Sequence, residues 1–155
     1  MMQMALPLAR IELLDAVQMG ACIAYSQLDE YRAVPTLFME FHGSPAAVAE
    51  QVETVRGVVG EFGGGDLGFA TLTEDRNRLW KARHNAWFAA KALRPGAEAF
   101  ATDACVPISR LAEAIAAAKA AAETAGLIAP LVGHVGDGNF HMLLLFDPAS
   151  PAELA

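Results

Sequence analysis

Two histidines and the glycine-rich turn between them are the residues whose types and spacing point most directly to chemistry. They lie at positions 133–141, which read Gly-His-Val-Gly-Asp-Gly-Asn-Phe-His. If Asp137 and Gly138 form a two-residue type I′ turn, a favoured conformation for Asp-Gly, His134 lies directly opposite His141 on a hairpin. The Cβ atoms of such a pair are about 4.5 to 5.5 Å apart. At that separation two imidazole nitrogens can bind one metal ion, each at about 2.0 to 2.1 Å.

Two imidazoles do not complete a catalytic metal centre. Zinc or manganese chemistry needs at least a third protein ligand, typically a carboxylate, and an open position for substrate. The alternative is a stacked pair of histidines on the rim of a hairpin, and the spacing alone leaves both interpretations open.

Other polar residues are more typical of structural roles. His42 ends a predicted strand, His84 lies on a predicted helix, and Asp137 is the residue that a tight turn favours. Glu40 flanks a predicted sheet face, but nothing in the sequence places it near the two histidines. Neither G-x-S-x-G, H-E-x-x-H nor a P-loop sequence occurs, so hydrolase and nucleoside-triphosphate functions have no support.

Residues 63–68, Gly-Gly-Gly-Asp-Leu-Gly, match the dinucleotide-binding pattern G-x-G-x-x-G. That fingerprint requires a strand before it and a helix after it, so that the helix N-terminus meets the pyrophosphate. Here a predicted helix precedes the glycines and a predicted strand follows. The segment is therefore predicted to be a connection.

The elements that must position the histidines follow from the hydrophobic periodicity. It predicts strands at 9–14, 35–42, 67–72, 99–106, 128–135 and 139–146, with helices at 15–26, 45–62, 74–93 and 107–125. Strands that are separated by helices and end in a hairpin are typical of an α+β or α/β layer. We expect an α+β fold, with a largely antiparallel sheet and helices packed mainly on one face.

The composition indicates one folded domain. The chain has 155 residues, of which 54% are hydrophobic, and its net charge of −7 comes with no cluster of basic residues. Nucleic acid and anionic membranes are therefore not expected as partners, because both need a concentrated basic face. No apolar run approaches the roughly 18 residues of a membrane span. The surplus of apolar residues predicts a surface that is partly covered by something else, and we expect a homodimer.

The two cysteines and the start of the chain predict a location. Cys22 and Cys105 are far apart and have no C-x-x-C partner, so we expect buried thiols in a reducing compartment. The first residues lack the basic and apolar regions of a secretory signal. Together these features predict a cytoplasmic protein.

The histidine motif resembles the hallmark of a known family, the C-terminal (cap) domain of FAD-linked oxidases. Within that family it looks most like the flavin-dependent D-lactate dehydrogenase (cytochrome) group. The segments at 9–15, 35–44, 79–84 and 102–107 resemble successive blocks of that domain in the same order. The resemblance therefore covers nearly all of residues 1–155 and implies ferredoxin-like elements in the fold.

The resemblance also implies a reaction, the oxidation of a D-2-hydroxy acid by hydride transfer to FAD. It assigns His134 and His141 as two ligands of a divalent metal, Zn²⁺ or Mn²⁺. In the family, the third ligand and the catalytic base belong to a Glu-His-Gly block, which is not present before Ala155. We therefore expect a truncated cap with no catalytic base, an FAD-binding domain that is separate from this chain, and a chain that is inactive by itself. The full-length enzyme would be cytoplasmic or peripheral to the membrane.

Arg83 is the other residue that the resemblance assigns. It matches the arginine of the family's Trp-x-x-Arg block, which implies a clamp for the substrate carboxylate. Trp80, Arg83 and Trp87 share one stripe of the predicted helix. The alternative is therefore an arginine that stacks on the two tryptophans.

Two apolar positions predict the size of the substrate. Relatives that act on dicarboxylic hydroxy acids have a lysine and an asparagine where this chain has Ala101 and Leu143. Losing both donors favours a small monocarboxylate, D-lactate first and glycolate as an alternative. Two further hypotheses stay open: a non-catalytic ligand-binding or dimerisation module, and a metal enzyme that completes its site from a second copy of the chain.

Overall fold

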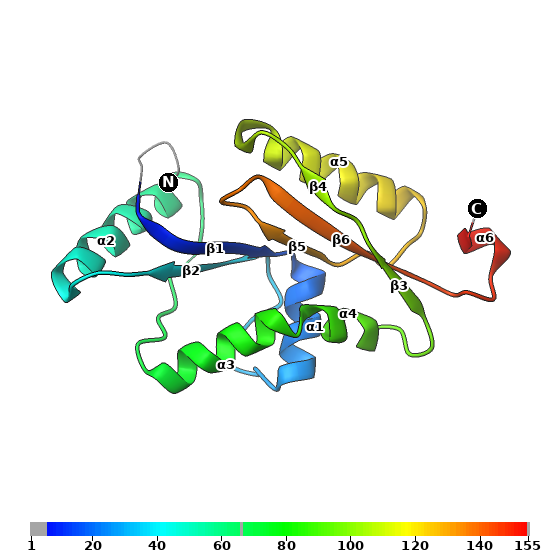
Figure 1. The fold of residues 1–155 in the computed structure, drawn as a ribbon, viewed down its shortest axis with the longest axis horizontal. Helices are drawn as coiled ribbons and strands as arrows, with labels where there is room; N and C mark the ends of the chain where they lie inside the picture. Colours follow the sequence, from blue (N-terminus) through cyan, green and yellow to red (C-terminus); the bar gives the residue numbers. More distant parts are fainter. Residues whose placement is uncertain (1–5, 66, 155) are drawn as a thin grey trace.

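An antiparallel β-sheet of six strands organises residues 6–65 and 67–154, the part of the chain that a computed structural model describes (Figure 1). The strands lie in the order β2-β1-β5-β6-β3, and the short β4 also pairs with β6. Their bounds are β1 Leu8–Leu14, β2 Thr36–Phe41, β3 Glu98–Ala101, β4 Ala104–Cys105, β5 Leu131–His134 and β6 Asn139–Phe146. The predicted α+β class with an antiparallel sheet is confirmed.

Helices cover both faces of this sheet. Their bounds are α1 Ala16–Ser26, α2 Pro45–Glu61, α3 Thr73–His84, α4 Ala86–Ala92, α5 Leu111–Thr124 and α6 Pro151–Leu154, with a 3₁₀ turn, η2, at Ile108–Arg110. Leu14 and Val132 pack with α1 and α4 on one face. On the other face, Leu131 and Phe140 pack with α5. Figure 1 shows α5 on one side of the sheet and α1, α3 and α4 on the other, a more even distribution than the sequence predicted.

Asp15 fixes the junction between β1 and α1. Its side chain accepts the N–H of Gln18 at 2.8 Å, which caps the helix, and the N–H of Leu131 on β5 at 3.2 Å. Lys119 of α5 pairs with the same carboxylate, which is almost fully buried. One side chain therefore joins a helix start, a central strand and a helix on the opposite face.

Several predicted elements differ from the structure. The strand predicted at 99–106 is divided into β3 and β4, and the strand predicted at 128–135 begins only at Leu131. Residues 67–72 form no strand, and α3 begins at Thr73, with Leu72 rather than Thr73 at the capping position. The helix predicted at 74–93 is broken at Asn85, so Trp80 and Arg83 belong to α3 and Trp87 belongs to α4. The helix predicted at 107–125 starts as the turn η2 before α5. At the break after α3, α4 packs against α1, a tertiary contact that the local sequence does not reveal.

The surface of the described residues exposes one cysteine and several large apolar side chains. Cys22 is buried as predicted, but Cys105 is exposed, because it lies at the sheet edge on the short strand β4. Large apolar side chains are also exposed, among them Phe62 at the end of α2 and Phe100 on β3. Within residues 6–65 and 67–154, no helix has the length and apolar character that crossing a membrane requires.

Candidate metal and carboxylate site

The hairpin that carries the two histidines has a longer turn than the sequence predicted. His134 pairs with Asn139 and His141 pairs with Val132, so residues 135–138 form a four-residue loop. The predicted two-residue turn is wrong because a type I′ turn needs positive φ at both central residues. Gln27 is the only non-glycine with positive φ among the described residues, so Asp137 does not adopt it. Gly138 does, with φ of 77°, and the N–H of Asp137 closes the loop on the carbonyl of His134 at 2.9 Å.

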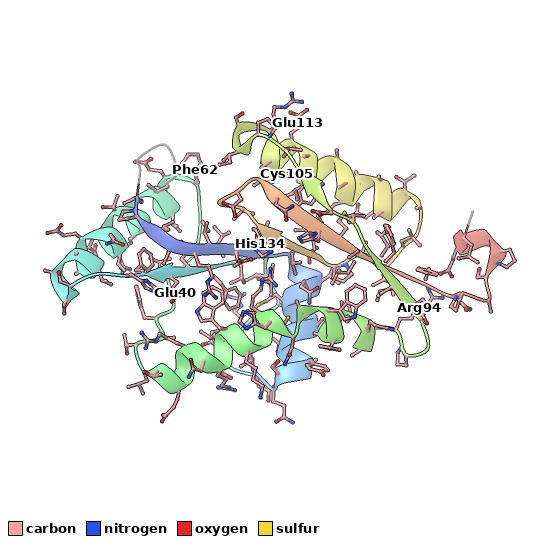
Figure 2. All side chains as sticks on the ribbon, in the orientation of Figure 1. Glu40, Phe62, Arg94, Cys105, Glu113 and His134 are labelled. Carbon is pink, nitrogen blue, oxygen red and sulfur yellow. The ribbon has the colours of Figure 1, made fainter. Side chains whose placement is uncertain are left out.

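The two histidines still face each other. The change of register shifts the pairing by two residues, and a shift by two keeps side chains on the same face of a strand. His134 and His141 are therefore diagonal neighbours, with ring centroids 5.8 Å apart in an edge-to-face arrangement. Figure 2 shows His134 near the middle of the sheet, on the side covered by α3. Both rings remain partly exposed, with side-chain exposure of 47% and 26%.

Glu12 of β1 holds His134. Nδ1 of His134 lies 2.8 Å from Glu12 Oε1, and the Nη2 group of Arg83 donates to Glu12 Oε2 at the same distance. The glutamate is 7% exposed. An anion in such a position needs positive or hydrogen-bonding partners, and here it has one on each oxygen.

A backbone carbonyl holds His141. Its Nδ1–H donates to the carbonyl oxygen of Thr102 at 2.8 Å. Asp103 lies 3.7 Å from the same nitrogen and accepts a hydrogen bond from the side-chain amide of Asn139 at 2.8 Å. The shorter contact, to Thr102, is the one that sets the ring orientation.

These contacts fix the chemistry of both rings. A carboxylate and a carbonyl can only accept, so Nδ1 carries the hydrogen in His134 and in His141. In neutral imidazole the lone pair is then on Nε2, for which no hydrogen bond is formed within the described residues. Ligating histidines have this arrangement, with the second ring nitrogen donating to a carboxylate or carbonyl. Both rings therefore have the tautomer that metal-ligating histidines of this type need.

A third ligand is not found among the described residues. Within residues 6–65 and 67–154, no group of three or more His, Cys, Asp or Glu side chains is arranged to hold a metal ion. Glu40, which the sequence left unplaced, pairs with Arg10 and His42 on the outer part of the sheet (Figure 2). His84 lies beside Trp80, with ring centroids 6.5 Å apart.

Arg83 is largely buried beside Glu12, the carboxylate that holds His134. Its side chain is 11% exposed and forms the ion pair with Glu12. Its Nε is buried and has no hydrogen-bond partner within residues 6–65 and 67–154. The cation–π contact on Trp80 is formed by Arg10, whose guanidinium carbon lies 4.6 Å from the ring centroid. Arg83 therefore does not stack between the tryptophans at the surface, which was the alternative to a carboxylate clamp.

The two apolar positions that predicted a small substrate lie on the same face. Ala101 and Leu143 are directly opposite each other on β3 and β6. Leu143 is two residues beyond His141 on its strand, so the two side chains point to the same side of the sheet. Sequence reasoning missed Glu12 and Thr102 as contributors to this face. The available signal for Glu12 was an acid in a strand that is apolar apart from it and Arg10, whereas Thr102 gave none.

A family model described as FAD linked oxidases, C-terminal domain, matches residues 1–155. The chain belongs to this family. It is 48% identical over 153 residues to the probable mitochondrial D-lactate dehydrogenase of Danio rerio, a match that covers 99% of this chain and 31% of the relative. It is 40% identical over 149 residues to the mitochondrial D-lactate dehydrogenase (cytochrome) of Arabidopsis thaliana, covering 96% and 26%. It is also 30% identical over 119 residues to glycolate oxidase subunit GlcD of Escherichia coli K12, covering 77% and 23%.

The comparisons correct the predicted location. The Danio rerio, Arabidopsis thaliana and Kluyveromyces lactis relatives are all named mitochondrial, so the prediction of a cytoplasmic protein is wrong. It relied on the first residues of the chain. Because the chain spans between a quarter and a third of these relatives, its first residues carry no information about targeting.

The family name implies FAD. Hollows of about 310 Å³ and 380 Å³ lie against α5 and beside the loop after α2. Neither is lined by His134, His141 or Arg83. The second hollow includes Gly64 and Gly65 of the G-x-G-x-x-G match, but no strand precedes these glycines, as that motif requires.

Proposed function

We propose that this chain is the substrate-facing part of a flavoprotein oxidoreductase that oxidises a small D-2-hydroxy acid. D-lactate is the first candidate and glycolate the second. The family and the names of the relatives support this assignment. The single observation that carries it is the pair of histidines on one sheet face, each with Nδ1–H held by an acceptor and Nε2 left open.

In this proposal His134 and His141 are two ligands of a divalent metal, Zn²⁺ or Mn²⁺. A bound metal would act as a Lewis acid toward the hydroxyl and carboxylate oxygens of the substrate. Two neutral imidazoles leave the ion positively charged, and Glu12 and the Thr102 carbonyl keep both rings in the ligating tautomer. The third ligand and the catalytic base belong to the family's Glu-His-Gly block, outside these 155 residues.

Arg83 is the proposed clamp for the substrate carboxylate. Guanidinium groups bind carboxylates through two parallel hydrogen bonds, and Arg83 uses Nη2 on Glu12 while its Nε has no partner. Glu12 then has a second role, since it holds the guanidinium beside the histidines. Ala101 and Leu143 offer no donor for a second carboxylate, which favours a monocarboxylic substrate.

The flavin in this proposal is bound by a domain that is separate from these residues. We therefore expect the 155-residue chain alone neither to bind FAD tightly nor to oxidise D-lactate. The exposed apolar side chains, such as Phe62, Phe88 and Phe100, support the further proposal that the isolated chain forms a homodimer.

A chimaera tests the proposed function. The segment of the Danio rerio relative that matches this chain is replaced by residues 1–155, and D-lactate oxidation is followed with an artificial electron acceptor. We expect an active chimaera in which His134→Ala or His141→Ala lowers kcat/KM by at least about 100-fold. His42→Ala is the matched control, since the His42 side chain is exposed and, among the described residues, pairs only with Glu40.

A folded, FAD-containing chimaera in which all three histidine variants are equally active would contradict the proposal. The sheet would then be a binding or dimerisation module in which the histidine pair is incidental.

A further inference from the structure

On the side of β6 that pairs with β3 and β4, the hydrogen bonds are irregular at one residue, Thr102. Ala101 pairs with Leu143 on β3, and Ala104 pairs with Phe140 on β4. The register is the same on both sides of the gap, so Thr102 lies opposite Met142. As in a regular ladder, the N–H of Thr102 donates to the carbonyl of Met142, at 2.9 Å.

The return hydrogen bond is made by a side chain. The N–H of Met142 donates to the hydroxyl oxygen of Thr102 at 2.9 Å, in the place where a regular ladder uses the carbonyl. Met142 is 4% exposed, so its N–H needs a partner within the protein. The threonine hydroxyl therefore satisfies a buried donor that would otherwise need the Thr102 carbonyl.

The carbonyl released in this way is the one that holds His141. It accepts the Nδ1–H of the ring at 2.8 Å. One residue thus supplies two acceptors, its hydroxyl to the sheet and its carbonyl to the histidine. Without the hydroxyl, a single carbonyl oxygen would face both the Met142 N–H and the His141 Nδ1–H.

We propose that Thr102 is a positioning residue for His141: its hydroxyl replaces its own carbonyl in the β-ladder, and the freed carbonyl fixes the His141 ring with Nε2 open. The consequence for metal binding rests on the proposed function. The effect on the ring itself is a property of the metal-free chain and can be measured separately.

The test reads the tautomer of His141 by ¹⁵N NMR of the ring in the metal-free chain, well above the ordinary imidazole pKa of about 6.5. We expect the Nδ1–H form in the wild type and in Thr102→Ser, which keeps the hydroxyl. Thr102→Val keeps the shape and removes the hydroxyl, so His141 should change to the mixture of tautomers of a free imidazole. Thr124→Val is the matched control, because its hydroxyl bonds only within α5.

Asp103 offers a second acceptor for the Nδ1–H of His141 in the valine variant, since its carboxylate lies 3.7 Å from that nitrogen. Thr102→Val is therefore also made together with Asp103→Ala, and Asp103→Ala alone should keep the wild-type tautomer. An unchanged tautomer in the folded double variant overturns the proposal, and so does the Nε2–H form in the wild type. The wild-type reading keeps the proposal falsifiable even if the valine variants do not fold, because the Nε2–H form would overturn it.

Zinc binding separates this proposal from the proposed function. If His141 is a ligand, Thr102→Val should weaken Zn²⁺ binding by about 10- to 100-fold, as loss of a group that holds a ligating histidine does. A wild type that binds no Zn²⁺, with the tautomer change intact, contradicts the metal site and leaves Thr102 as the residue that positions His141. If Thr102→Val changes the tautomer of His141 but binds Zn²⁺ as tightly as the wild type, then the tautomer of His141 does not control zinc binding.

Discussion

Glu12 is the residue on which most of the candidate site depends. It accepts from His134 with one oxygen and from Arg83 with the other, each at 2.8 Å, and it comes from a strand more than 70 residues away from either partner. The carboxylate therefore does two things at once. It sets the tautomer of a histidine and holds a guanidinium in place.

Replacing Glu12 with glutamine should disturb both partners. A neutral amide has one acceptor oxygen, so it cannot accept from His134 and Arg83 in the present geometry. We expect Zn²⁺ binding to weaken by about 10- to 100-fold, measured by calorimetry. Glu40→Gln is a close control, because Glu40 also lies between an arginine and a histidine, Arg10 and His42. Equal zinc affinity in both variants would show that Glu12 does not support the site.

The sequence predicted the residues of the site better than their contacts. The histidine pair was evident from its spacing around Asp-Gly, because strand alternation is local information. Glu12 and Thr102 were missed because their partners lie 122 and 39 residues away along the chain. Which acceptor meets which ring depends on the order of strands in the sheet, and one sequence does not encode that order locally.

At the scale of the elements, local sequence signals explain which helices and strands were predicted with nearly correct bounds. Strands β1 and β2 and helices α1 and α2 lie close to their predicted bounds, since each has a cap or a clear apolar period. The hairpin turn was wrong because Asp137 does not adopt positive φ. The break at Asn85 was missed because residues on both sides favour a helix, and the packing of α4 against α1 cannot be read from the local sequence.

Asp15 should be the cap whose loss costs most stability. Asp15→Ala removes the cap of α1 and leaves the N–H of Leu131 without its partner. We expect a loss of about 2 kcal/mol in the free energy of unfolding, measured with urea, from about 1 kcal/mol for each effect. Ser44→Ala at the exposed cap of α2 should cost about 1 kcal/mol or less. Equal losses in the two variants would contradict the structural role given to Asp15.

The C-terminal helix α6 should dock in a pH-dependent way. Hydrogen bonds from Arg94, at 2.7 and 3.0 Å, lower the pKa of Glu153 to about 2 from a usual 4.5. A lowered pKa in the folded state adds stability above the usual pKa, and that stability is lost as the pH falls toward 2. Glu153→Gln should therefore lower the Tm at neutral pH, with the difference from wild type shrinking between about pH 4.5 and 2.

The control for that measurement is Glu113→Gln. Glu113 pairs with Arg110 one helical turn away at the surface, and such pairs contribute little to stability. Its Tm should follow that of the wild type at every pH. A constant difference between wild type and Glu153→Gln down to pH 2 would contradict the pairing of Glu153 with Arg94.

At the scale of the whole molecule, several large apolar side chains are exposed to solvent. Phe62 is 84% exposed, and Leu72 and Phe100 are exposed by 63% and 60%. We expect the isolated chain to dimerise through apolar contacts, and to do so more strongly as salt screens the repulsion between chains of charge −7. Sedimentation equilibrium at low and high salt measures this. A monomer at all concentrations and both salt levels would contradict the prediction.

We propose that one face of the sheet presents two histidines as partners for a single metal ion. A Zn²⁺ titration of the metal-free chain, followed by the ring ¹⁵N signals of its histidines, tests this directly. We expect Nε2 of His134 and Nε2 of His141 to shift together and fit one dissociation constant, while His42 and His84 do not change. Signals of His134 and His141 that stay fixed, or that shift independently of each other, would contradict it.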